Sequence, residues 1–96
     1  MSNYKVIVSK LNELLSLTSE IFTENQIDSV SSLINAGEWN LSIETLCDLL
    51  YEEELPITKQ AYELLKELGL ILNMEKSNWE ILEPQIVPDY SQLKEV

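Results

Sequence analysis

The sequence of 96 residues predicts an all-α fold, a compact bundle of four or five helices that forms a single domain over residues 1–96. Apolar residues recur at helical spacing in several segments, and hydrophobic residues make up 45% of the chain, which is enough for one core. Only two glycines and three prolines are present, too few for the many turns of a β-sandwich or β-barrel.

The first half of the chain is predicted to form two helices. Residues 4–8 would also suit a short strand, but apolar spacing that continues to Leu17 favours a helix over 3–17. The apolar residues of this helix are Val6, Ile7, Leu11, Leu14 and Leu15. Thr23 and Gln26 fit a capping box that opens a second helix, and Gly37 fits its C-terminal end. The inner face of the second helix is predicted to contain Ile27, Val30, Leu33 and Ile34.

A third, amphipathic helix is predicted over residues 39–53, so close behind the second that the two form an antiparallel hairpin. One stripe along it is apolar and has the spacing of a buried face: Ile43, Leu46, Cys47 and Leu50. Another stripe is acidic, because Glu44, Asp48 and Glu52 recur every four residues. Like charges at this spacing destabilise a helix by a few tenths of a kcal/mol, so helix stability does not explain the acidic stripe.

The acidic stripe has two interpretations. It is either the solvated face of an acidic protein or a surface that binds a positively charged partner. Glu53 and Glu54 extend the negative charge past the end of the helix. Tyr51 lies on the same side, where it is either a contact residue or half-buried against Leu55.

The second half of the chain is predicted to add a fourth and a fifth helix. Pro56 interrupts the chain, and Thr58 is a suitable N-cap for a helix that ends at Gly69. Its apolar seam consists of Ala61, Leu64, Leu65 and Leu68. An apolar connector follows, formed by Leu70, Ile71, Leu72 and Met74. Ser77 is a candidate cap for a short fifth helix that carries Trp79 and Leu82 before Pro84, and residues 88–96 are predicted to be a loose tail.

Charge is the strongest compositional signal. The chain has 17 acidic residues against 6 lysines and no arginine, which gives a net charge of −11. Such a surface repels the phosphates of nucleic acid and anionic membranes, so direct binding to either is not expected. A basic protein partner would instead be attracted, and its association would be accelerated.

The residue types that enzymes use most are scarce. The chain has no histidine and a single cysteine, Cys47, whose place on the apolar stripe predicts a buried thiol. A lone cysteine indicates a reducing compartment, and no apolar run is long enough to span a bilayer, so a cytoplasmic location is expected. No metal-ligand spacing or phosphate-binding glycine loop is present. We therefore expect no catalytic residue, no cofactor, no metal and no enzymatic activity.

Two other functions, a carrier and a regulatory adaptor, also have to be considered. Asp28-Ser29-Val30 resembles the Asp-Ser-Leu motif of acyl carrier proteins, which are also small, acidic and helical. The glycine that usually precedes the motif is replaced by Gln26-Ile27, and Ser29 falls inside the predicted second helix. A carrier that uses Ser29 and a small acidic regulatory adaptor are thus the alternative functions. Trp39 and Trp79 are either interface anchors or core residues.

The central stretch resembles a known family. Ala36-Gly37-Glu38-Trp39, Glu44-Thr45-Leu46-Cys47-Asp48, Leu50-Tyr51-Glu52 and Pro56-Ile57 are similar to the MafI-like family of small bacterial immunity proteins. Related proteins accompany contact-dependent growth inhibition systems. The likeness continues through Tyr62 and Leu68-Gly69 to Trp79, which covers about half of the chain.

The resemblance implies a cytoplasmic antidote that binds a cognate toxin domain and blocks it. In such families the toxin is often a ribonuclease, including EndoU-type enzymes. A ribonuclease needs a basic cleft for RNA, which agrees with the acidity of this chain. Our hypothesis places part of the toxin-binding surface on Glu44, Asp48, Tyr51, Glu52, Glu53 and Glu54. The sequence specifies neither the toxin nor the oligomeric state.

Overall fold

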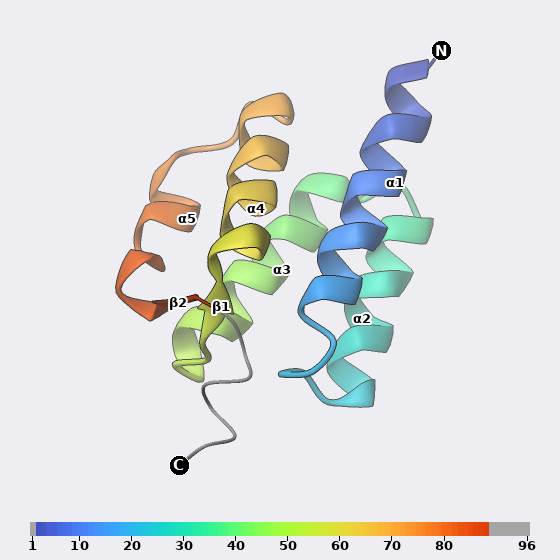
Figure 1. Ribbon diagram of the computed structural model, residues 1–96. Coiled ribbons are helices and arrows are strands. Elements are labelled where there is room, and N and C mark those ends of the chain that lie inside the picture. The colour runs from blue at the N-terminus through green and yellow to red at the C-terminus, as the bar shows by residue number, and fades with distance from the viewer. Residues whose placement is uncertain (1, 89–96) are drawn as a thin grey trace.

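The computed structural model describes residues 2–88, which contain five α-helices, one 3₁₀ helix and two very short strands (Figure 1). The α-helices are α1 (Ser2–Leu17), α2 (Glu24–Asn35), α3 (Trp39–Glu52), α4 (Lys59–Ile71) and α5 (Ser77–Glu80). The other elements are β1 (Ile57–Thr58), η1 (Glu83–Gln85) and β2 (Ile86–Val87). The predicted all-α bundle is confirmed. Of the predicted tail, residues 89–96 lie outside the described residues.

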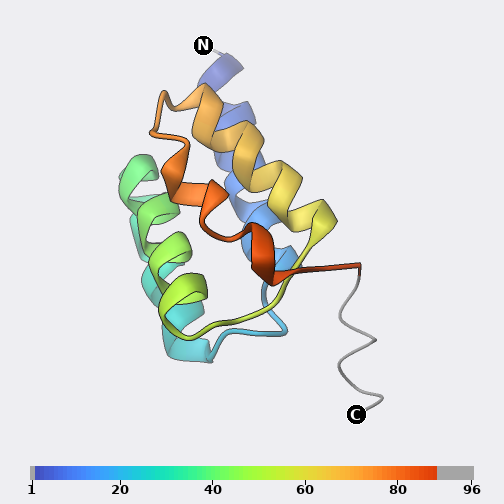
Figure 2. The same cartoon turned by 90° about the vertical axis from the view of Figure 1, so that its left-hand side faces the viewer.

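The four longer helices contact one another in a ring. Helix α1 packs against α2 and α4, and α3 packs against the same two helices. Helices α2 and α3 run in opposite directions, as predicted, and α1 and α4 do so as well (Figure 1). The segment from α5 to β2 crosses the gap between α3 and α4 on one side of the bundle (Figure 2).

The core consists largely of the predicted stripes. In α3, the four residues of the apolar stripe are all buried: Ile43, Leu46, Cys47 and Leu50. In α4, the predicted seam is buried in the same way: Ala61, Leu64, Leu65 and Leu68. The C-terminal segment contributes Trp79 and Leu82 to the core, and both are buried. In α1 the match is less complete, because Leu11, Leu14 and Leu15 are buried whereas Val6 is exposed.

Two predicted N-caps are present. The backbone N–H of Gln26 donates to Thr23 Oγ1 over 3.1 Å, and the N–H of Thr23 donates to Gln26 Oε1 over 2.9 Å, which completes the capping box of α2. Thr58 Oγ1 accepts from the N–H of Ala61 over 3.1 Å at the start of α4. These bonds satisfy donors that the first turn of a helix leaves unpaired.

Helices α2, α3 and α4 end in the same motif. Each is followed by a residue with a left-handed backbone: Gly37 (φ 79°), Glu54 (φ 52°) and Asn73 (φ 62°). The next N–H then donates to a carbonyl in the last turn, in the pairs Glu38 to Leu33, Leu55 to Leu50 and Met74 to Gly69. This pattern is the Schellman motif, which usually has glycine or asparagine at the left-handed position. Glu54 is the exception among the three.

The predicted end of the fourth helix is wrong. Helix α4 continues through Gly69 to Ile71, and Asn73 takes the left-handed position. Gly69 is needed for another reason, because a Cβ at this position would overlap the indole of Trp79. The predicted apolar connector is also partly wrong, since Leu70 and Ile71 are helical and exposed.

The start of the fifth helix also differs from the prediction. Ser77 is the first helical residue and does not cap α5, because Lys76 occupies the N-cap position without a side-chain bond. Asn78 Nδ2 instead donates to the carbonyl of Glu75 over 3.0 Å. Leu82 is buried as expected but lies just after α5, directly before η1.

Two short strands join the middle of the chain to its C-terminal segment, and the sequence did not predict them. Strand β1 pairs in parallel with β2, with Ile57 opposite Ile86 and Thr58 opposite Val87. Each strand has two residues, too few for an alternating pattern to be recognised. The pairing fixes the segment after η1 beside the entry to α4.

The contact between Gly69 and Trp79 gives a prediction about stability. Alanine is favoured over glycine by about 1 kcal/mol inside a helix, but overpacking a core costs about 1–3 kcal/mol. Because the new Cβ would overlap a fully buried indole, we expect Gly69→Ala to lower the free energy of unfolding, measured by urea denaturation. Ser9→Ala on the exposed face of α1 is the control and should have little effect. A Gly69→Ala variant as stable as the wild type would contradict the packing described.

Candidate functional site

The six residues of the hypothesised partner-binding surface are all exposed. The apolar stripe of α3 is buried, and four of the hypothesised residues lie exposed outside it on the helix, from the flank to the far side: Glu44, Asp48, Tyr51 and Glu52. Glu53 is directed toward α2, where Gln26 Nε2 donates to its carboxylate over 3.0 Å.

A groove lies beside the C-terminal half of α3 and has a volume of about 770 Å³. Its lining comes from the end of α3, the segment before β1, and the segment from α5 to β2: Tyr51, Glu52, Glu54, Pro56, Ile81, Pro84, Gln85 and Val87. A smaller hollow of about 230 Å³ adjoins it, with Tyr51 and Ile81 common to both. The smaller hollow also includes Cys47, Asp48, Ser77 and Asn78.

We refer to the two hollows together as the α3 groove. Four of the hypothesised residues line it, namely Asp48, Tyr51, Glu52 and Glu54. Glu44 lies one turn before Asp48 and outside the groove, and Glu53 faces α2. The structure thus brings the central part of the hypothesised surface together and separates Glu53 from it.

The two walls of the α3 groove are held together by one side chain. The amide of Gln85 donates to the carbonyl of Leu50 over 2.8 Å and to the carbonyl of Leu55 over 2.7 Å. The Leu50 carbonyl, in the last turn of α3, also accepts from the N–H of Leu55 over 3.0 Å, so it has two donors. The segment from α5 to β2 is also bonded to α4, because Tyr62 Oη donates to the Glu83 carboxylate of η1 over 3.1 Å. The groove is therefore built on bonded elements and not on a free loop.

The groove combines apolar side chains with exposed carboxylates. Tyr51 is 49% exposed and Ile81 is 46% exposed, so both present apolar surface to an incoming group. Asp48, Glu52 and Glu54 supply negative charge, and none of the lining residues is basic. A lysine or arginine side chain fits this combination, because its aliphatic stem can pack on apolar walls while its charged head meets carboxylates.

On the side of the groove formed by α3, the charged residues of α3 and of the neighbouring α2 are all acidic. No lysine occurs between Lys10 and Lys59, so α2, α3 and their connections contain only acidic charged residues. Every aspartate and glutamate among residues 2–88 is exposed. This half of the molecule repels phosphate groups and attracts cations at distances of about 8–10 Å, the range set by physiological salt.

Cys47 lines the floor of the smaller hollow and is almost fully buried. It is 4% exposed, and burial raises the pKa of its thiol from 9.0 to about 12, with smaller contributions from Asp48 and Glu44. A thiol with this pKa is protonated at neutral pH and is a poor nucleophile. The predicted buried thiol is confirmed.

The other candidate residues are placed as follows. Ser29 is exposed in the middle of α2, six residues after its N-cap Thr23. Trp79 is a core residue, with 1% exposure. Trp39 is half-buried and packs against Tyr4, with ring centroids 5.3 Å apart. Its indole N–H is enclosed and has no hydrogen-bond partner among the described residues.

Residues 2–88 have neither the ligand cluster of a metal site nor a membrane-spanning helix. In that part of the chain, no cluster of three or more histidine, cysteine or acidic side chains has the arrangement of a metal site. None of the described helices combines the length and the hydropathy needed to cross a membrane.

Sequence reasoning missed the second wall of the groove. Ile81, Pro84, Gln85 and Val87 are about thirty residues away from the acidic stripe, and nothing in their local pattern marks them as part of a site. The Gln85 side chain acquires its role only through the carbonyls of Leu50 and Leu55. Comparisons with known proteins add no further residues, because no family model, curated protein or solved structure matches this chain.

The left-handed backbone at Glu54 gives a prediction about stability. A residue other than glycine costs about 1–2 kcal/mol in this conformation, so we expect Glu54→Gly to raise the free energy of unfolding by about 1 kcal/mol. Glu53→Gly is a matched control, since it removes the same charge one residue earlier, where φ is −97°. That control should lower the free energy of unfolding. Urea denaturation of both variants measures the difference. A Glu54→Gly variant no more stable than the wild type would show that the backbone at Glu54 is not strained.

The raised pKa of Cys47 gives a prediction about pH. Between pH 9 and 12 the unfolded chain loses the thiol proton while the folded chain keeps it. The folded state therefore binds more protons, and this contribution to stability falls as pH rises through that window. In Cys47→Ala the contribution is absent, so its free energy of unfolding should fall less steeply above pH 9 than that of the wild type. Parallel pH curves for the two proteins would contradict the burial of Cys47.

Proposed function

We propose that this chain is an immunity protein that binds and neutralises a basic toxin domain of the ribonuclease class, including EndoU-type enzymes. The observation that carries the proposal is the α3 groove, where apolar walls and carboxylates suit the basic side chains of a protein partner. In this proposal the protein acts by binding in the cytoplasm and catalyses no reaction.

Competition with RNA provides the proposed mode of inhibition. A ribonuclease concentrates lysine and arginine side chains around its active site to hold RNA phosphates. Glu44, Asp48 and Glu52 present carboxylates about 6 Å apart along one face of α3, the rise of four helical residues. These carboxylates can pair with the same basic side chains, so that toxin bound to this face cannot bind RNA.

The Schellman end of α3 supports a functional role for Glu54. Strained backbone conformations often occur at functional sites, where they are retained despite their cost in stability. At the corresponding positions after α2 and α4, the chain has glycine and asparagine, which tolerate the conformation. A glutamate at this position places one more carboxylate in the groove at a cost to folding.

The resemblance of residues 36–57 to MafI-like immunity proteins supplies the class of partner. The groove supports this assignment independently, because it selects for positive charge. A carrier function receives no comparable support, since Ser29 lies in the middle of α2, far along the helix from its N-terminus.

Copurification tests the function directly. The tagged full-length protein is isolated from its source cell, and the intact mass of the tagged protein is measured together with that of any partner. The proposal predicts a stoichiometric basic partner whose RNA-cleaving activity is detected only after the two proteins are separated. A stoichiometric partner without nuclease activity would overturn the ribonuclease assignment, and a phosphopantetheine mass on the protein would establish the carrier alternative.

Charge reversal tests the role of α3. We expect the triple variant Glu44→Lys, Asp48→Lys, Glu52→Lys to bind the partner at least about a hundredfold more weakly, equivalent to about 2.7 kcal/mol. All three side chains are exposed, so the helical content should be unchanged by circular dichroism. Isothermal titration calorimetry or surface plasmon resonance measures the affinity.

A matched control separates local contacts from net charge. The variant Glu13→Lys, Glu20→Lys, Glu75→Lys makes the same change in net charge at exposed positions outside the groove. It should slow association and leave the dissociation rate close to that of the wild type. Equal losses of affinity in the two triple variants would exclude α3 from the interface.

A further inference from the structure

A second exposed apolar surface lies on α1 and α4, away from the α3 groove. Leu70 and Ile71 of α4 are 53% and 47% exposed, and they border a shallow hollow of about 550 Å³ on the outer face of that helix. Val6 of α1 is 47% exposed. None of these three residues lines the α3 groove.

The packing of α1 against α4 brings the three residues together. The two helices run in opposite directions and are joined by an ion pair between Lys10 Nζ and Glu67 Oε2, 3.0 Å apart. Val6 lies one turn before Lys10 in α1, and Ile71 lies one turn after Glu67 in α4. Because the helices are antiparallel, Val6 and Ile71 both lie one turn beyond the ion pair, toward the N-terminal end of α1 and the C-terminal end of α4. We call Val6, Leu70 and Ile71 the α1–α4 patch.

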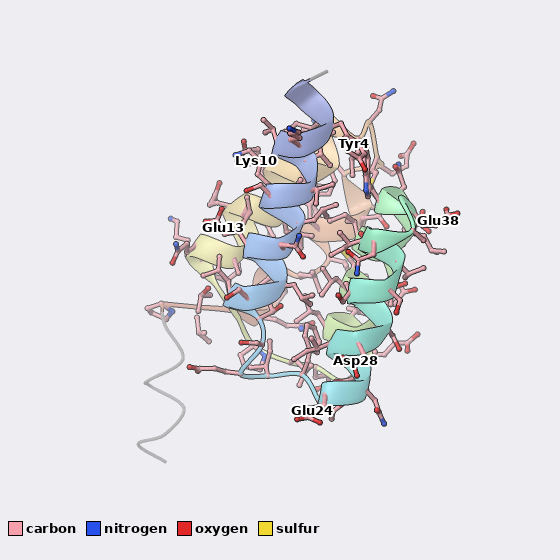
Figure 3. All side chains as sticks on the ribbon, turned by 90° about the vertical axis from the view of Figure 1, so that its right-hand side faces the viewer. Tyr4, Lys10, Glu13, Glu24, Asp28 and Glu38 are labelled. Carbon is pink, nitrogen blue, oxygen red and sulfur yellow. The ribbon has the colours of Figure 1, made fainter. Side chains whose placement is uncertain are left out.

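The two helices that carry this patch have nearly balanced charges, unlike α2 and α3. Helices α1 and α4 contain seven charged residues with described side chains: Lys5, Lys10, Lys59, Lys66, Glu13, Glu63 and Glu67. Helices α2 and α3 contain five, all acidic: Glu24, Asp28, Glu44, Asp48 and Glu52. Figure 3 shows this division, with Lys10 and Glu13 along the edge next to α4 and Glu24, Asp28 and Glu38 along the other edge.

We propose that the α1–α4 patch is the interface of a homodimer, in which a second copy of the chain docks through the same face about a twofold axis. Two molecules that each carry a net charge of −11 repel one another over most of their surface. On the α1–α4 face that repulsion is small, because lysines and glutamates nearly balance. In a twofold contact through these helices, lysines of one copy can pair with glutamates of the other.

The proposal is independent of the proposed function. It leaves the α3 groove of each copy uncovered, so that a dimer presents two separate grooves. The exposed stretch is limited in size, because α4 is 13 residues long and spans only about 20 Å. A contact of this size belongs to the small, weak class of interfaces, and we expect a dimer that dissociates at micromolar concentrations.

Sedimentation velocity of the full chain over a range of concentrations tests the proposal. The wild type should shift from monomer to dimer as concentration rises, and Leu70→Glu and Ile71→Glu should remain monomeric at all concentrations. Leu41→Glu and Ile81→Glu are matched controls, since Leu41 and Ile81 are 45% and 46% exposed but lie outside the patch. Both controls should dimerise as the wild type does.

Three outcomes would overturn the proposal. The first is a wild type that stays monomeric up to roughly 1 mM, a concentration above the dissociation constants of specific interfaces. The second is a Leu70→Glu variant that dimerises like the wild type while circular dichroism shows that it is folded. The third is a dimer that is lost in Ile81→Glu, which would place the contact at the α3 groove.

Discussion

Burial of the apolar stripe of α3 is the constraint on which both the core and the candidate site depend. Ile43, Leu46, Cys47 and Leu50 must face inward for α3 to pack against α2 and α4. Since a helix has fixed angular spacing, their burial turns Glu44, Asp48 and Glu52 toward solvent. Removing a side chain such as Leu50 from the stripe would cost about 2–5 kcal/mol, which is much more than the repulsion among the acids. Packing therefore determines the direction of the charged face.

The C-terminal segment turns that charged face into a groove. Trp79 packs on Gly69 and holds the segment to α4, while the amide of Gln85 bonds two carbonyls at the end of α3. Pairing of β1 with β2 fixes the end of the segment. The apolar wall opposite Tyr51 thus rests on contacts between parts of the chain that are distant in sequence. A partner that binds here contacts a bonded framework and does not have to order a free segment, which reduces the entropic cost of binding.

The sequence predicted what depends on local pattern. Periodicity located the stripes of α3 and α4, and cap residues such as Thr23 and Thr58 located the starts of α2 and α4. It could not predict the role of Gly69, because glycine is read locally as a helix end, whereas its contact with Trp79 is tertiary. The candidate site was likewise predictable only where it depends on local sequence. The acidic side of the groove is local to α3, but Gln85 and Ile81 join it only through the fold.

Hydrogen exchange of the full chain, alone and with the proposed basic partner bound, is the most direct test of the claim that underlies the proposed function. That claim is that the α3 groove is the surface that binds the partner. If the partner binds in the α3 groove, amide exchange in the complex is slower over residues 48–58 and 81–88 and unchanged over residues 4–10 and 60–67. Slowing confined to α1 and α4, or the same exchange at residues 48–58 with and without the partner, would contradict it.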